Sequence, residues 1–154
     1  MISRRALTGA VQQLLATATG RPVGVGTVPL DAARTPAPPP YTLLYPLDYS
    51  TDDQMLADQH RGAVATYQTT FVSGPTPGQA ASTGTVEQAE WLADRARTAV
   101  LDRAVGGATG YAQPLTVPGA VCYRREATEV GATSDPNDGI ITYVIRFRFY
   151  LDAA

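Results

Sequence analysis

Residues 66–101 read TYQTTFVSGPTPGQAASTGTVEQAEWLADRARTAVL, and this stretch decides the fold. Its first seven residues are rich in β-branched and aromatic side chains, as is typical of a strand, and the small residues, Gly and Pro of 73–84 predict a loop. A helix over 86–104 should follow, since Thr85 is a suitable N-cap and Gln88 occupies the capping-box position. The stretch contains no Lys, His or Cys, so it is organised for packing and carries no reactive group.

A second helix is predicted over 3–19, because apolar residues recur there at intervals of three and four positions. Ser3 is a suitable N-cap, and Gly20 should end the helix. The apolar stripe consists of Leu7, Val11, Leu14, Leu15 and Ala18. One side of this helix is therefore expected to be buried.

Strands are predicted by alternating or β-branched segments. They cover 23–28, 41–49, 63–72, 121–130 and 140–151. Pro46 indicates that the second of these lies at a sheet edge or contains a bulge. The last strand has the clearest pattern, with one wholly apolar face and Arg146 and Arg148 on the other.

The segments between the strands are expected to be irregular. Residues 34–40 form a proline-rich connector, and 52–61 should be a polar loop with a helical turn. The polar segment 131–139 is long for a hairpin turn. This order of elements predicts a single α+β domain over 1–154, a two-layer sandwich in which two helices cover one face of a mainly antiparallel sheet of four to five strands.

Composition narrows the functional classes. The net charge of −2 removes the simplest argument for nucleic-acid binding, and all twelve cations are Arg. Ser3-Arg4-Arg5 resembles a twin-arginine export signal, but the residues after it follow helical spacing, so we expect no export. No apolar run approaches the roughly 18 residues that a membrane span needs.

Residues suited to catalysis are few. His60 is the only His and Cys122 the only thiol, and without Lys the chain has no P-loop lysine or Schiff-base residue. Cys122 is better explained as a small packing residue of a strand. We therefore expect no enzyme activity, no cofactor and no metal.

Two short motifs have ordinary structural explanations. Asp135, Asn137 and Asp138 faintly resemble a calcium loop but lack its later Glu, so a turn-forming role is favoured. The sequence Pro38-Pro39-Pro40-Tyr41 matches the peptide that WW domains bind. Because Tyr41 also opens an alternating strand pattern, sheet packing is favoured for it.

Arg146 and Arg148 remain as interface candidates. They share one strand face, where they could be solvated and stacked on Tyr150, could pair with Glu126 or Glu129, or could form a subunit interface. The candidate interface adds the polar turn before this strand and consists of Arg146, Arg148, Tyr150, Asp135, Asn137 and Asp138.

Four segments carry a resemblance to a known family. They are Arg4-Arg5-Ala6-Leu7, the strand YQTTFVSG at 67–74, the segment EQAEWLADRAR at 87–97 and the strand RFRFYL at 146–151. Through them the chain resembles the tail terminator proteins of long-tailed (siphovirus-type) bacteriophages, especially those of actinobacterial hosts. The proline-rich segment 34–40 and the loop 74–84 have no counterpart in this pattern.

The resemblance implies a structural virion subunit. Such a subunit forms a ring with copies of itself, usually a hexamer, which caps the head-proximal end of the tail tube, stops its polymerisation and joins it to the head connector. The implied partners are the tail tube protein and the head–tail connector protein, with DNA passing through the lumen without specific binding. Assembly would take place in the host cytoplasm. A head–tail connector or tail completion protein is the nearest alternative, and a small α+β hydrolase or ligand-binding domain is another.

A mechanism of ring closure follows as a hypothesis. The strand 140–151 would span about 40 Å, roughly twice the usual length. If it overhangs its neighbours, its free backbone groups would pair with a second copy.

Overall fold

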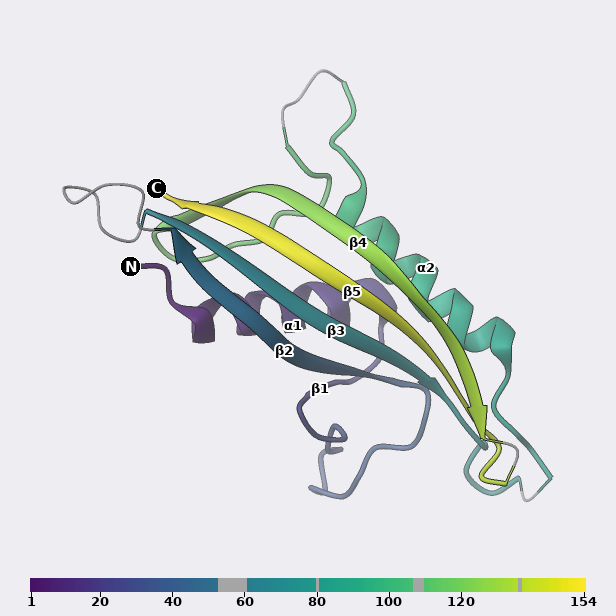
Figure 1. The fold of residues 1–154 in the computed structure, drawn as a ribbon. Helices are drawn as coiled ribbons and strands as arrows, with labels where there is room; N and C mark the ends of the chain where they lie inside the picture. The colour runs from purple at the N-terminus through teal and green to yellow at the C-terminus, as the bar shows by residue number, and fades with distance from the viewer. Residues whose placement is uncertain (53–60, 80, 107–109, 136) are drawn as a thin grey trace.

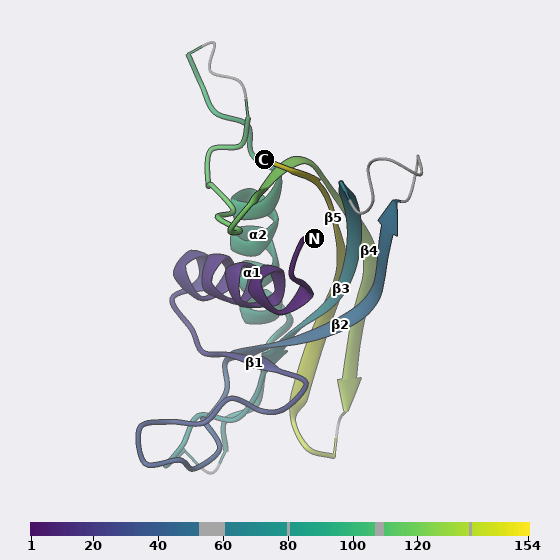
Figure 2. The ribbon, with the colours of Figure 1, turned by 90° about the vertical axis from the view of Figure 1, so that its left-hand side faces the viewer.

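The computed structural model describes residues 1–52, 61–79, 81–106, 110–135 and 137–154. Two helices lie on one face of a five-stranded sheet, so the predicted two-layer α+β sandwich is confirmed (Figures 1 and 2). The elements are α1 (Arg4–Thr19), β1 (Val23–Val25), β2 (Tyr41–Asp52), β3 (Gly62–Ser73), α2 (Val86–Leu101), β4 (Ala120–Asp135) and β5 (Ile140–Ala153). None of the helices in these ranges is long and apolar enough to cross a membrane.

The sheet has the strand order β1-β2-β3-β5-β4. Every neighbouring pair is antiparallel except β1 and β2, which run parallel over three residues. The prediction of a mainly antiparallel sheet is therefore confirmed. The last strand of the chain, β5, lies inside the sheet between β3 and β4.

The helix N-caps are those that the sequence predicts. Ser3 Oγ accepts a hydrogen bond from Ala6 N at 3.3 Å, and Thr85 Oγ1 accepts one from Gln88 N at 3.1 Å. The side chain of Gln88 does not return to Thr85. Instead, the buried hydroxyl of Ser73, at the end of β3, accepts from Thr85 N and donates to Gln88 Oε1. This hydroxyl fixes the start of α2 against the sheet.

The core fills the space between the sheet and the two helices. From the sheet, the predicted apolar face of β5 is buried from Ile145 to Leu151 and half-buried at Ile141 and Tyr143. The ring of Phe149 meets Tyr67 edge-on at 5.9 Å between centroids. From the helices, the predicted stripe of α1 and that of α2 both point into this space, with Leu7, Leu15 and Leu92 fully buried. The packing of both stripes on one sheet face gives the domain its two layers.

Four predicted boundaries are wrong, among them the end of β2, which is Asp52 rather than residue 49. The helix α2 ends at Leu101 rather than 104, because Asp102 is extended with ψ of 134°. The strand β4 continues to Asp135, so the expected long turn 131–139 contains five strand residues. Gly131, with φ of 112°, lies at a bulge where the ladder shifts register and continues. The strand predicted over 23–28 is reduced to Val23–Val25.

Pro46 has the position that its chemistry requires. The register of β2 with β3 shifts between Pro46 and Tyr49, and β1 covers β2 only as far as Leu44, so Pro46 lies at a bulge on an open edge. The predicted loop 52–61 lies largely outside the described residues, which exclude 53–60 and with them His60. Asp52 itself belongs to β2.

Candidate interaction surface

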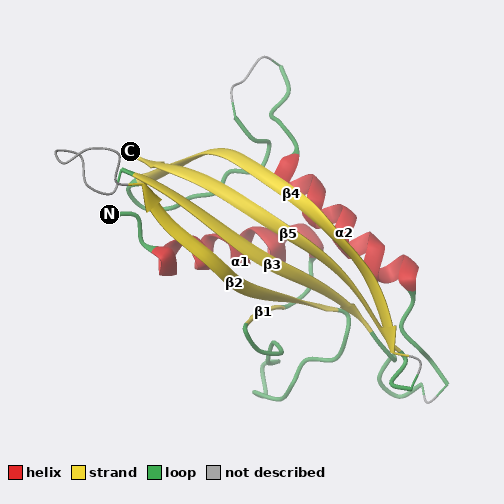
Figure 3. Ribbon diagram, viewed as in Figure 1, coloured by secondary structure: helices red, strands yellow, loops and turns green. Residues whose placement is uncertain are grey.

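The side of the sheet that faces away from the helices carries the predicted arginines. Side chains alternate along a strand, so the burial of Phe147 and Phe149 on the core side places Arg146, Arg148 and Tyr150 on the opposite side. On β4, Arg124 and Glu126 lie opposite Tyr150 and Arg148. We call these five residues the sheet face, and Figure 3 shows the sheet from this side with the helices behind it.

Tyr150 is the centre of the sheet face. Its hydroxyl donates to Glu126 at 2.9 Å, and the guanidinium carbons of Arg124 and Arg148 lie 5.1 and 5.6 Å from its ring centroid. The stacking on Tyr150 expected for Arg146 and Arg148 is therefore confirmed for Arg148 only. The hydrogen bond from Tyr150 lowers the pKa of Glu126, as do the charges of Arg124 and Arg148. Glu126 thus stays ionised and is already engaged by Arg124 and Tyr150.

Arg146 and Arg148 keep their hydrogen-bond donors available. Arg146 is exposed and has no hydrogen bond, ion pair or ring contact with any residue that the structure describes. Arg148 is exposed and contacts only the ring of Tyr150 within the same part of the chain. Each guanidinium can therefore offer its full planar fork to a carboxylate of a partner.

Glu129 lies on the helix side of the sheet, so the predicted pairing of Glu129 with Arg146 or Arg148 is wrong. It is opposite Ile145, a core residue, and accepts hydrogen bonds from Arg97 Nε at 2.7 Å and from the hydroxyl of Tyr143 at 2.8 Å. Both bonds lower its pKa, that from Arg97 more strongly. This ion pair joins α2 to β4.

Asp135, Asn137 and Asp138 lie at the other end of β5, at the tip of the β4–β5 hairpin. Asp135 Oδ1 accepts a hydrogen bond from Asn137 N at 2.9 Å, so the predicted turn-forming role of Asp135 is confirmed. The tip is joined to the loop 74–84 by a bond from Gly84 N to Gly139 O. At about 3.3 Å per residue, Arg146 is roughly 20 Å from Ile140 at the start of β5. The structure therefore divides the six predicted interface residues into two separate groups.

The hypothesis that β5 overhangs its neighbours is wrong. It pairs with β3 over Ile141–Asp152 and with β4 over Ile140–Ala153, so both of its edges are used within the chain. Within the described residues, the open edges are the outer sides of β1 and β4 and the part of β2 beyond β1. β1 has only three residues, and β2 and β4 contain bulges, which disturb a ladder and discourage pairing with a second chain.

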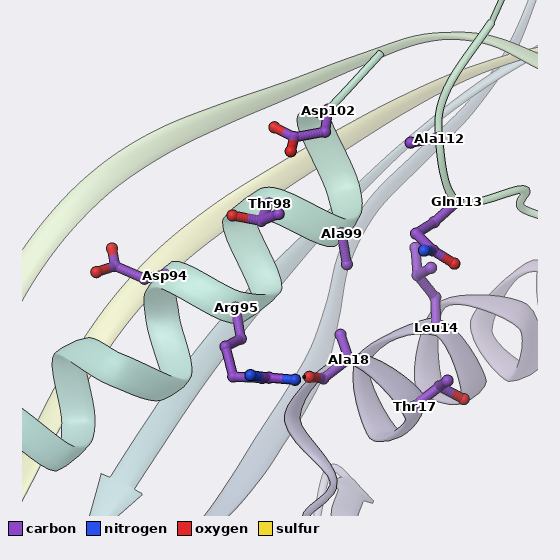
Figure 4. Close-up of a pocket in the computed structure, with 10 residues that line it drawn as sticks. All are labelled: Leu14, Thr17, Ala18, Asp94, Arg95, Thr98, Ala99, Asp102, Ala112 and Gln113. Atoms are coloured by element: carbon purple, nitrogen blue, oxygen red, sulfur yellow. Dashed lines mark hydrogen bonds between the residues drawn. The ribbon is translucent and has the colours of Figure 1, made fainter. Parts of the chain in front are cut away.

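A groove between α1 and α2 was not predicted from the sequence (Figure 4). Its volume is about 520 Å³, and Arg95 crosses it to donate from Nε to Ala18 O at 2.8 Å. The last turn of α1 has no basic residue of its own, so Arg95 supplies the cation that the free carbonyls favour. The guanidinium carbon of Arg95 also lies 5.0 Å from the ring centroid of the exposed Trp91. Their i, i+4 spacing was the sequence signal for this pair.

Arg125 is an unexpected buried cation. It is only 7% exposed, donates to Val100 O at 3.3 Å, and lies 4.2 Å from the ring centroid of Tyr111. Arg103 lies 4.1 Å from the same centroid, so one tyrosine stacks with two guanidinium groups. These contacts attach the segment after α2 to β4.

Cys122 has the environment of a packing residue. Its thiol lies against the core, and burial raises its pKa, which opposes formation of the nucleophilic thiolate. Among the described residues, no three His, Cys, Asp or Glu side chains are grouped so that they could hold a metal ion. Compared with known proteins, the chain matches no family model and no curated protein.

Proposed function

We propose that this chain is a structural subunit of a siphovirus-type phage tail, of the tail terminator kind. Copies of it form a ring, which we expect to be a hexamer, at the head-proximal end of the tail tube. The ring stops tube polymerisation and joins the tail to the head connector. The resemblance at 4–7, 67–74, 87–97 and 146–151 supports this proposal.

The observation that carries the proposal is the uncovered sheet face. Tyr and Arg are enriched in interface cores and among the residues that dominate binding energy. Here Tyr150 stacks with two arginines, and the forks of Arg146 and Arg148 are free within the described part of the chain. Such a surface is suited to binding a protein partner, and a structural role needs no reactive group.

The two ends of the ring would meet different partners. One end would contact the tail tube protein and the other the head–tail connector protein, and DNA would pass through the lumen without specific contacts. A head–tail connector or tail completion protein would use the same kind of surface. The groove between α1 and α2 favours the ligand-binding alternative, because its polar side chains, such as Arg95 and Gln113, could orient a small molecule.

The proposal is tested by adding the purified chain to growing tubes of the cognate tail tube protein. We expect a ring of six subunits by mass photometry, rings at one end of each tube by electron microscopy, and shorter tubes as the amount of added chain increases. The control is the same amount of an unrelated protein of similar size. Bare tube ends, unchanged tube lengths and a monomeric chain at high concentration would together contradict the proposal.

A further inference from the structure

Two patches on opposite sides of the sandwich carry opposite charges. On the sheet face, Arg124, Arg146 and Arg148 outnumber Glu126, which is engaged within the face. On the other side of the molecule, the exposed side of α2 carries Glu87, Glu90 and Asp94 with the exposed Trp91. We call these four residues the helix face.

The helix face is a continuous stripe. Residues three and four apart lie side by side on a helix, so Glu87, Glu90, Trp91 and Asp94 are neighbours. Glu87 and Glu90 form no hydrogen bond or ion pair with any described residue, whereas Asp94 pairs with Arg97. Trp91 is 47% exposed, and the guanidinium carbon of the exposed Arg95 lies 5.0 Å from its ring centroid, so this stripe combines carboxylates with an aromatic ring that a cation stacks on. Tryptophan is enriched among the residues that dominate binding energy, so its exposure makes this stripe a candidate binding surface.

The spacing of the charges matches between the two faces. Arg146 and Arg148 are two residues apart on a strand, a separation of about 6.6 Å. Glu87 and Glu90 are three residues apart on a helix, where the Cβ atoms are about 5–6 Å from each other. Arginine side chains are long enough to bridge this small difference, and each carboxylate can accept a bidentate guanidinium.

The sheet also offers an apolar surface for Trp91. Tyr45 on β2 lies opposite Gln68, which in turn lies opposite Arg146, so the three side chains form one row across the sheet. Leu43 is in the next row on the same side, opposite Thr70. Both Tyr45 and Leu43 are partly exposed. A tryptophan ring beside Arg146 would therefore find aromatic and aliphatic partners.

We propose that the sheet face of one copy of this chain docks on the helix face of the next copy, with Arg146 and Arg148 paired to Glu87 and Glu90. This inference rests on the proposed ring, for which it names the contact between subunits. Because the two faces are different, the contact is heterologous, and repetition closes a ring when the rotation per subunit allows it. No backbone pairing is needed, in agreement with the bulged edges of β2 and β4.

The test is a charge swap between the two faces. One variant carries Arg146→Glu and Arg148→Glu, and the other carries Glu87→Arg and Glu90→Arg. Like charges at an interface cost several kcal/mol, so we expect each variant alone to assemble at least about 100-fold more weakly than the wild type by sedimentation velocity. An equal mixture of the two variants should assemble again, because each altered face then meets an altered partner. A chain with all four substitutions should do the same alone.

A charge-matched control separates the specific contact from the change in net charge. Arg5→Glu with Arg34→Glu changes two exposed arginines that belong to neither face, and we expect it to assemble like the wild type. Thermal melting of each variant checks folding. If a charge-swap variant does not fold, it is replaced by the variant in which the same two residues are changed to Gln. If the variants assemble as well as the wild type, or if the mixture of the two swaps does not assemble, the proposed contact is wrong. The proposed ring is not contradicted by either result. A wild type that stays monomeric with tubes present overturns both.

Discussion

Replacing Thr69 by Val should stabilise the protein. Thr69 lies on the core side of β3, opposite Leu44 and Ile145, and all three residues are 0% exposed. Its hydroxyl oxygen has no hydrogen-bond partner among the described residues. Val has nearly the same shape and the same branching at Cβ, so Thr69→Val removes the unpaired polar group and keeps the packing.

The size of the effect follows from the burial. A buried hydroxyl without a partner costs about 1–3 kcal/mol in proteins, and the substitution should return about 1 kcal/mol of this. For a chain of this length, 1 kcal/mol corresponds to a rise in melting temperature of about 2–4 °C.

The measurement is a pair of urea and thermal unfolding curves for Thr69→Val and for Thr70→Val. Thr70 is the next residue of β3 and is partly exposed on the other side of the sheet, so its hydroxyl can reach water. We expect Thr70→Val to change the free energy of unfolding by less than about 0.5 kcal/mol. If Thr69→Val is no more stable than Thr70→Val, the hydroxyl of Thr69 is paired in solution and the reasoning fails.

Two further substitutions test the hydrogen bonds and the ion pair that connect α2 to the sheet. Ser73→Ala should lower the free energy of unfolding by about 1–2 kcal/mol in urea titrations, because the hydroxyl that bonds Thr85 N at 2.9 Å and Gln88 Oε1 at 2.7 Å is lost. The pKa of Glu129 is lowered by Arg97, so this ion pair stabilises the fold above the ordinary pKa of a glutamate and loses its effect as the pH falls through the lowered value. Glu129→Gln should therefore reduce stability near pH 7, by less than about 1 kcal/mol because the side chain is 44% exposed, and should match the wild type at pH 2.

Much of the fold could be predicted because local patterns and tertiary packing agree. The stripe of α1 and the alternation of β5 each define one side that the structure buries, and the N-cap predicted at Thr85 is present. The end of α2 could not be predicted. After Leu101, Ala112 N donates to Asp102 O at 2.8 Å, so contacts with a segment ten residues later override helix propensity.

The interaction surface could be predicted only in part. Alternation places Arg146 and Arg148 on one side of a strand, but strand order is not encoded locally, so the position of β5 between β3 and β4 was missed. Gly131 was interpreted as part of a turn, although a glycine with positive φ also suits a bulge inside a long strand. Tyr111 stacks with Arg103 and Arg125, which are distant from it in the sequence. No regular residue spacing in the sequence predicts this contact.

The internal position of β5 changes the kind of force that would hold a ring together. Backbone pairing at a free edge is nearly independent of sequence, whereas docking through side chains depends on which charges meet. Two sheet faces placed together would oppose Arg146 and Arg148 to their own copies, and two helix faces would oppose carboxylates in the same way. Both symmetrical dimers are therefore disfavoured by like charges. The remaining arrangement places the sheet face of one subunit on the helix face of the next. After each subunit is added, the assembly still has one free sheet face and one free helix face, and these two meet when the ring closes.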